Sequence, residues 1–317
     1  MPKPPATPER CVELWIKYHE EHDTMPRSIT DYRLNALRAI AIFKANAKET
    51  LPYKWKEKDL RWIKKYWENN HIKPNGERSG PLAVKTIKVY MCTISLLAAH
   101  YKNNVGKEAK MRYRQDVRPN VDWLEYEDIL KILGSNMNPM QRLAFNFEAQ
   151  IGMRRIDIIR MKNKMIDFKH GLIEVDGKGH KARTVYFHRD TPDALEKYLA
   201  WKEELRQKAI RHARKHHTKF VDSDYLLVYR QGSKLLPYSE KGTGFDKQFV
   251  QKLTKLTGIK IKNHTLRRTW GREAYYRGGM DIVDIAAVYG HSNIITTLKY
   301  IGADEKRVRA AMDKLPY

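Results

Sequence analysis

The pattern of apolar residues changes from a helical to a strand period near residue 171, and this change limits the folds open to the chain. Up to residue 150 the apolar side chains recur three and four residues apart, as on one face of an α-helix. Residues 171–175 and 184–188 alternate instead, and a loop rich in glycine and lysine lies between them. After Phe245 the helical period returns. We therefore predict a mainly α fold with a small β-sheet.

The helices expected in the first third of the chain form a domain of their own, over residues 1–104. The first helix starts at Thr7, because threonine caps helices and the proline that follows it fits the first helical turn. Ser28 is expected to cap the second helix, and two more are expected at 58–69 and 83–101.

Residues 105–121 carry few large apolar side chains and many charges, which is typical of a solvated linker. Arg112 and Arg114 lie in this stretch, and we expect them to contact phosphates while the segment joins two domains. The second domain then covers residues 122–317. It begins with helices, continues through the two alternating strands and a third short strand at 225–229, and ends with helices.

The charge of the chain indicates a polyanionic partner. Lysine and arginine total 61 against 37 aspartates and glutamates, which gives a formal net charge of +24. When the chain is divided near Val117, the two parts carry +10 and +14, so the charge is not confined to one basic tail. Nucleic acid is the usual partner for such a chain. An acidic membrane surface is the alternative, but no uninterrupted apolar run reaches the length of a membrane span.

The remaining features of the composition favour a cytoplasmic, DNA-associated protein. The N-terminus lacks the apolar centre of a secretory signal. The two cysteines, Cys11 and Cys92, provide neither a disulfide framework nor the spacing of a metal site.

The residues that carry chemistry lie in three blocks, at 151–157, at 177–183 and from residue 264 to residue 300. Six of them are suited to work on a phosphodiester: Arg154, Lys178, His264, Arg267, His291 and Tyr300. Two guanidiniums can hold the non-bridging oxygens and neutralise growing charge, and two imidazoles can donate hydrogen bonds or shuttle a proton. A lysine on a hairpin is a suitable acid for a departing oxygen, and a tyrosine hydroxyl is a possible nucleophile. The blocks hold no carboxylate cluster for Mg²⁺, so we expect no metal.

These blocks resemble the tyrosine recombinase family, which includes phage integrases and Xer-like recombinases. The segment I-G-M-R that ends at Arg154 resembles the family's T-G-L-R, and G-K-G-H-K-A-R at 177–183 matches its G-K-G-x-K-x-R hairpin. The segment H-T-L-R-R-T that starts at His264 matches H-x-L-R-H-T. The segment that ends at Tyr300 matches L-G-H-x-x-x-x-T-T-x-x-Y. Each motif alone is weak, but six matched positions in order and at similar spacing are specific.

Three departures from the family pattern accompany the match. Asp157 replaces the usual glutamate, Arg268 replaces a usual histidine, and Trp270 with Gly271 replaces a usual aromatic–alanine pair. They affect packing near the site and leave all six matched positions in place.

The resemblance implies a site-specific DNA recombinase with a SAM-like, helical core-binding domain and an α/β catalytic domain that together clamp duplex DNA. Tyr300 would attack the scissile phosphate and form a 3′-phosphotyrosine. Arg154 and Arg267 would stabilise the pentacoordinate phosphorus with help from the two histidines, and Lys178 would protonate the leaving 5′ oxygen. A partner strand would then reverse the reaction through a Holliday junction, without any cofactor.

The same resemblance implies supporting residues and partners. Lys181 and Arg183, like Arg112 and Arg114, are expected to contact the DNA backbone, and Asp157 to orient the helix of the first catalytic arginine. The expected partners are double-stranded DNA and three further copies of the chain in a tetramer on synapsed sites. Accessory DNA-bending or regulatory proteins are further partners of this kind of enzyme.

Two other functions stay open. A type IB topoisomerase uses similar residues on a single duplex, and an architectural DNA-binding protein could retain a vestigial site. A C-terminal helix at about 304–315 carries an apolar stripe that includes Val308, Met312 and Leu315. This stripe either packs on its own domain or docks on a neighbouring protomer.

Overall fold

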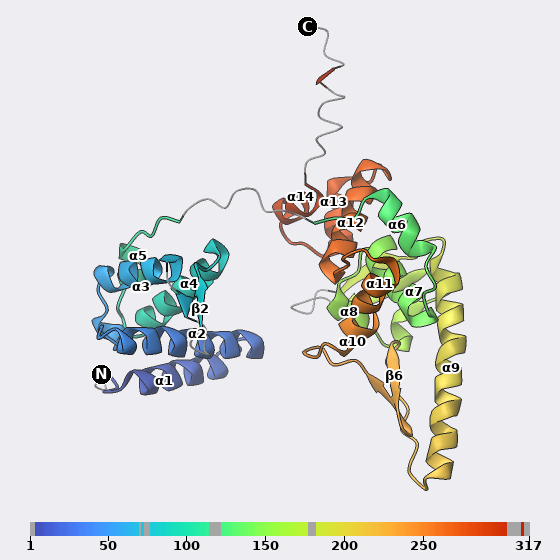
Figure 1. Ribbon diagram of the computed structural model, residues 1–317, viewed down its shortest axis with the longest axis horizontal. Coiled ribbons are helices and arrows are strands. Elements are labelled where there is room, and N and C mark those ends of the chain that lie inside the picture. The colour runs from blue at the N-terminus through green and yellow to red at the C-terminus, as the bar shows by residue number, and fades with distance from the viewer. Residues whose placement is uncertain are drawn as a thin grey trace. The chain divides into compact units, whose positions relative to one another are not determined.

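The structure is a computed structural model, and it describes residues 4–69, 71–72, 77–113, 122–176, 182–302 and 312–313. The chain divides into two compact units, Met1–Pro119 and Asn120–Tyr317 (Figure 1). Within the described part of the chain, no helix combines the length and the apolar character needed to cross a bilayer. The predicted helix at about 304–315 lies outside the described residues, apart from Met312 and Asp313.

The first unit is helical, as predicted. Its elements are α1 (Pro8–Glu21), α2 (Pro26–Ala45), the 3₁₀ turn η1 (Pro52–Lys54), α3 (Glu57–Asn69), β1 (His71–Ile72), β2 (Arg78–Gly80), α4 (Val84–His100) and α5 (Val105–Glu108). Thr7 caps α1 by accepting a hydrogen bond from the backbone N of Arg10, as predicted. The cap predicted at Ser28 is wrong, because Pro26 already occupies the first position of α2 and Ser28 lies inside the helix.

The core of the first unit is built from large side chains of several helices. Trp15, Phe43 and Trp67 are each at most 1 % exposed. Val105 and Ala109 are also buried, so the first residues of the predicted linker form a helical turn that packs on this unit.

The second unit combines helices with two small sheets, which confirms the predicted fold class. It begins with α6 (Tyr126–Leu133), α7 (Pro139–Phe145), the π-helix η2 (Asn146–Gln150), α8 (Arg155–Arg160), the 3₁₀ turn η3 (Asn163–Met165), β3 (Ile166–Asp167), β4 (Leu172–Asp176) and β5 (Ala182–Tyr186). It continues with α9 (Thr191–Lys215), β6 (Val228–Gln231), β7 (Lys234–Pro237), α10 (Gly244–Gln248), α11 (Val250–Thr257), α12 (Asn263–Tyr276), α13 (Ile282–Tyr289) and α14 (Ile294–Ile301).

The larger sheet has the antiparallel order β3-β4-β5. Leu172 pairs with Tyr186 and Asp176 pairs with Ala182, so β4 and β5 form the predicted hairpin. The strand predicted at 225–229 is displaced to Val228–Gln231. It pairs with β7 in a separate hairpin that the sequence pattern did not predict.

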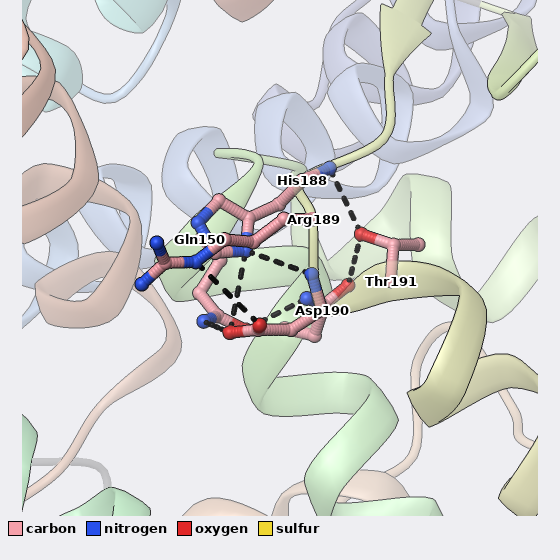
Figure 2. A network of polar contacts seen from close by, with 6 residues as sticks. Gln150, His188, Arg189, Asp190 and Thr191 are labelled. Atoms are coloured by element: carbon pink, nitrogen blue, oxygen red, sulfur yellow. Dashed lines mark hydrogen bonds and ion pairs between the residues drawn. The ribbon is translucent and has the colours of Figure 1, made fainter.

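The long helix α9 is fixed at its first turn to the segment that leads into α8. The hydroxyl of Thr191 donates to Asn146 Oδ1 at 2.9 Å and accepts from the backbone N of His188 at 3.0 Å. Gln150 Nε2 donates to Asp190 Oδ2 at 2.8 Å, and Figure 2 shows these contacts together. These hydrogen bonds join the start of α9 to η2. The last residue of η2, Gln150, lies four residues before Arg154 in the sequence.

Candidate active site

Four of the six predicted site residues come together where α8, α12, α13 and α14 meet. Arg154 is the N-cap of α8, Arg267 lies in α12, His291 follows α13, and Tyr300 lies in the last turn of α14. Contacts of α12 with α14 and of α13 with α14 hold these elements together. Lys178 and Lys181 lie outside the described residues, and so does Arg114.

Arg267 is a buried cation held by neutral groups. Its side chain is 2 % exposed and donates from Nη1 to the carbonyl of Gly152 and from Nη2 to the carbonyl of Tyr289, the latter at 2.8 Å. The guanidinium also stacks over the ring of Tyr289, 4.1 Å from its centroid. Burial and the nearby charge of Arg154 lower the pKa of Arg267 to about 9, so it remains a cation at neutral pH.

The departure at Trp270 and Gly271 has a structural reason. A Cβ at Gly271 would overlap the hydroxyl of Tyr289, which donates to the carbonyl of Arg267 at 2.6 Å. The ring of Trp270 packs edge-on against Tyr289, with 5.2 Å between centroids. The glycine therefore leaves room for the tyrosine that holds Arg267 in place.

Arg154 is half-buried beside an ion pair between Arg183 and Asp157. Its Nη2 donates to the carbonyl of Gly290 at 3.2 Å. Arg183 Nη2 donates to Asp157 Oδ2 at 2.5 Å, and its Nε donates to the carbonyl of Val288 at 3.0 Å. Burial and the charge of Arg183 lower the pKa of Arg154. Arg183 therefore links β5 to α8 and to the end of α13, next to Arg154.

Gly290 permits this close approach of two arginines. It ends α13 in the left-handed conformation, with φ of +61°. A Cβ at this position would lie 3.1 Å from Arg183 Cδ and 3.3 Å from Arg154 Nη1. A side chain would therefore be strained and would press on both arginines.

His291 and Tyr300 form an aromatic pair next to the arginines. Their ring centroids are 5.3 Å apart, edge to face, and His291 Nδ1 is 2.9 Å from Thr297 Oγ1. The guanidinium of Arg268 lies over the ring of Tyr300, 5.2 Å from its centroid. Desolvation and the charges of the neighbouring arginines lower the pKa of His291 to about 4, so the imidazole is neutral at neutral pH.

His264 stands at the exposed start of α12, one turn before Arg267. Partial desolvation and the surrounding arginines lower the pKa of this imidazole as well. Both predicted histidines are therefore neutral bases beside a group of cations.

Two residues of α12 that the motifs did not identify hold the chain immediately after Tyr300. Arg272 Nη1 donates to the carbonyl of Ile301 at 3.2 Å, and the hydroxyl of Tyr276 donates to the carbonyl of Gly302 at 2.9 Å. The end of α14 is therefore fastened to the helix that carries Arg267. An aromatic or basic residue one and two turns after the H-x-L-R motif is a weak signal, because such residues are common on helix surfaces.

Glu148 is a second residue that the motifs did not identify. It lies in η2 and is fully buried, and neither carboxylate oxygen has a hydrogen-bond partner within the described part of the chain. Burial and the nearby Asp246 raise its pKa well above the usual range. An acid inside an apolar helical run is the sequence signal that could have revealed it.

The residues predicted to contact DNA differ in exposure. The side chain of Arg183 is 10 % exposed and paired with Asp157. The DNA contact expected of Arg183 and the supporting role expected of Asp157 both stay predictions. Arg112 is exposed and belongs to a surface pocket of the first unit that is also lined by Arg61, Lys64 and Lys65. The DNA contact at Arg112 stays a prediction. The basic side chains around Arg112 are compatible with it.

Known proteins similar to this chain point to one family. The phage integrase family matches residues 120–307. The tyrosine recombinase XerC of Thermodesulfovibrio yellowstonii is 30 % identical over 165 residues, which cover 51 % of this chain and 50 % of that protein. XerC of Caldanaerobacter subterraneus subsp. tengcongensis is 27 % identical over 197 residues, covering 61 % and 51 %. The chain thus spans about half the length of the curated relatives it matches.

Solved structures show the same fold at low sequence identity. The Tn1549 transposon integrase in complex with transposon right end DNA superposes with a TM-score of 0.66 at 17 % identity, over 97 % of this chain and 99 % of that one. The site-specific recombinase XerH, bound to palindromic difH substrate, has a TM-score of 0.66 at 19 % identity, over 96 % and 84 %. With the family match over residues 120–307, these similarities show that the chain belongs to the phage integrase family of tyrosine recombinases.

Proposed function

We propose that the protein is a site-specific DNA recombinase that cleaves and rejoins DNA through a 3′-phosphotyrosine at Tyr300. The observation that carries the proposal is the pair of cations beside Tyr300, Arg154 and Arg267, with which no acid forms an ion pair in the described part of the chain. Arg267 is buried with only carbonyls and a ring as partners, and Arg154 donates to a carbonyl. Buried cations are stable when an anion completes the site. A phosphodiester held by both arginines supplies that anion next to the tyrosine.

The chemistry follows from this placement. The oxygen of Tyr300 attacks phosphorus, the bond from phosphorus to the 5′ oxygen breaks, and the phosphate becomes esterified to the tyrosine. The neutral imidazoles of His264 and His291 are able to accept the phenolic proton, and Lys178 is the proposed donor to the 5′ oxygen. Arg154 and Arg267 stabilise the added negative charge in the transition state. Attack by a 5′-hydroxyl of a partner strand reverses these bond changes, so the reaction needs no external energy source.

The partners that the family resemblance implies belong to this proposal. The Tn1549 integrase is in complex with transposon right end DNA and XerH is bound to palindromic difH substrate, which supports double-stranded DNA as the substrate proposed for this chain. We propose a tetramer on two synapsed sites, a location at cellular DNA, and a C-terminal helix at about 304–315 that docks on a neighbouring protomer. The proposed domains are a core-binding domain over 1–104, a linker over 105–121 and a catalytic domain over 122–317.

Covalent capture of DNA tests the proposal. The purified chain is incubated with fragmented DNA of its source cell, denatured in detergent, and the DNA that stays attached is sequenced. We expect one recurrent sequence, and none from Tyr300→Phe. Detergent-stable DNA in equal amount from both proteins would contradict the assignment, and the absence of any adduct would favour an architectural DNA-binding protein.

A second assay separates the recombinase from a type IB topoisomerase. Supercoiled plasmids without the captured sequence should stay supercoiled, because a recombinase cleaves at its own site. Efficient relaxation of arbitrary plasmids would favour the topoisomerase.

A further inference from the structure

Positive charge is segregated along α9. The first part of the helix, from Thr191 to Gln207, carries four acidic and three basic residues. Its ion pairs include Lys197 with Asp193 at 2.8 Å and Arg206 with Asp222 at 2.8 Å. From residue 208 to residue 221 the chain has basic residues and no acidic one. The end of α9 is therefore much more positive than its beginning.

The hairpin β6–β7 adds cations to the same place. Its turn lies against the last turns of α9, where a Cβ at Gly232 would be 3.4 Å from the ring of His212. We define the basic tip as residues 211–219 together with 230–234. Six exposed cations belong to it: Arg211, Arg214, Lys215, Lys219, Arg230 and Lys234. In the described part of the chain, none of the six forms an ion pair.

The basic tip is attached to a small hydrophobic core at its base. Ala209, Val228 and Leu235 are each at most 1 % exposed and pack together. The strand segment at Val221 pairs with Lys234, and its N–H donates to the carbonyl of Ser233 at 3.2 Å. Figure 1 shows the end of α9 and this hairpin extending beyond the other helices of the second unit. The cations are thus held in place on a projection.

Helix stability explains only part of this charge. Cations in the last turn of a helix interact favourably with its dipole, which accounts for Arg214 and Lys215. The dipole does not account for Lys219, Arg230 and Lys234, which lie outside the helix. Six like charges without counterions repel one another, so their gathering indicates an anionic partner.

We propose that the basic tip binds the phosphate backbone of duplex DNA that flanks the reacting phosphate. The statement that this DNA flanks the reacting phosphate rests on the proposed recombinase function. The polar network of Figure 2 joins the start of α9 to η2, and Gln150 in that network lies four residues before Arg154 in the sequence. Arg211 lies 20 residues after Thr191, so the helix between them extends about 30 Å at about 1.5 Å per residue. That length equals about nine base pairs at about 3.4 Å each, so the tip reaches DNA well outside the reacting step.

Matched pairs of substitutions test the proposal. The tip variant is Arg214→Gln with Lys215→Gln, and the control is Lys197→Gln with Lys208→Gln. Both remove two exposed cations from the same helix, but each control lysine has an acid one turn earlier, at 2.8 Å for Lys197 and 3.9 Å for Lys208. A second tip variant, Arg230→Gln with Lys234→Gln, leaves α9 unchanged. Circular dichroism and thermal unfolding check that all of them fold.

The readout is the affinity for duplex DNA at a series of salt concentrations, measured by fluorescence anisotropy. Each phosphate contact contributes about 0.9 to the slope of log affinity against log salt. On a long duplex of arbitrary sequence we expect each tip variant to reduce that slope by about 1 to 2, and the control to leave it unchanged. On captured-site DNA trimmed to about half a helical turn beyond the cleavage point, the tip variants should match the wild type.

Other outcomes overturn the proposal. Equal slopes for the tip and control variants on the long duplex would mean that the tip contacts no DNA. Loss of binding to phosphatidylserine vesicles with unchanged binding to the duplex would assign the tip to a lipid surface instead. Because anisotropy needs no strand cleavage, failure of covalent capture would refute the recombinase function without deciding the result for the tip.

Discussion

Replacing Gly290 by alanine tests the close packing of Arg154 and Arg183 beside the proposed phosphate site. The residue has φ of +61°, a conformation that costs an alanine about 1 kcal/mol. The new Cβ would lie 3.1 Å from Arg183 Cδ and 3.3 Å from Arg154 Nη1, so a neighbour must shift by a few tenths of an ångström. Arg183 is held by Asp157 and by the carbonyl of Val288, whereas Arg154 donates to Gly290 itself. We therefore expect Arg154 to move.

The expected losses follow from that movement. A misplacement of about 1 Å at a reacting centre costs about 10²-fold in rate, so a few tenths of an ångström should slow strand cleavage about three- to tenfold. The free energy of unfolding should fall by about 1 kcal/mol, and DNA affinity should stay nearly unchanged because many phosphates contribute to it. Cleavage is measured in single-turnover experiments on a nicked duplex of the captured sequence, which traps the covalent intermediate.

Gly258→Ala is the matched control. Gly258 also ends an eight-residue helix in the left-handed conformation, with φ of +74°, and no described atom lies within 4 Å of its added Cβ. It should lose about the same stability, about 1 kcal/mol, and keep the wild-type cleavage rate. Cleavage by Gly290→Ala at the wild-type rate, or an equal loss in Gly258→Ala, would refute the reasoning.

Three further predictions concern single groups of the same unit. Glu148 has a raised pKa in the folded chain, so its contribution to stability is present below the ordinary carboxyl pKa and is lost as the pH rises through the folded-state value. The melting temperature of Glu148→Gln should therefore rise relative to the wild type as pH increases above about 5, and a constant difference in thermal melts would contradict this. The pKa of His291, about 4 without ligand, should rise by about one unit or more when phosphate neutralises the arginines; an unchanged NMR titration would contradict the anion site. Tyr276→Phe removes the donor to the carbonyl of Gly302 and should slow cleavage up to about fivefold without weakening DNA binding. The control is Tyr275→Phe, which changes an exposed neighbouring side chain and should not affect cleavage.

The sequence motifs select residues that the structure brings together, but not the residues that support them. Motif spacing picked out Arg154, Arg267, His291 and Tyr300, which lie close to one another in the fold, and their catalytic roles stay a proposal. The DNA contact expected of Arg183 from the hairpin motif stays a prediction, and the structure adds a contact that the motif does not show, the ion pair of Arg183 with Asp157. No local pattern reveals that pairing, since it joins a strand to a helix 26 residues away.

In the fold, too, elements set by local sequence were predicted and elements set by distant contacts were missed. The hairpin β4–β5 follows from alternation and a glycine-rich turn, and Thr7 follows from capping chemistry. The strand β7 was missed because Lys234–Pro237 is too short to show a period, and its pairing with β6 depends on the packing of both strands against α9. Glu148 was missed because the stability of a buried acid depends on neighbours that are distant in sequence.

The bond between Tyr300 and DNA is the central claim, and mass spectrometry of the trapped complex tests it most directly. The covalent adduct is digested with nuclease and protease, and the peptide that carries a nucleotide is sequenced by fragmentation. We predict a single modified residue, Tyr300, linked through a 3′-phosphate, with a free 5′-hydroxyl on the released strand. A nucleotide on any other residue, or a 5′-phosphate linkage to Tyr300, would contradict the account.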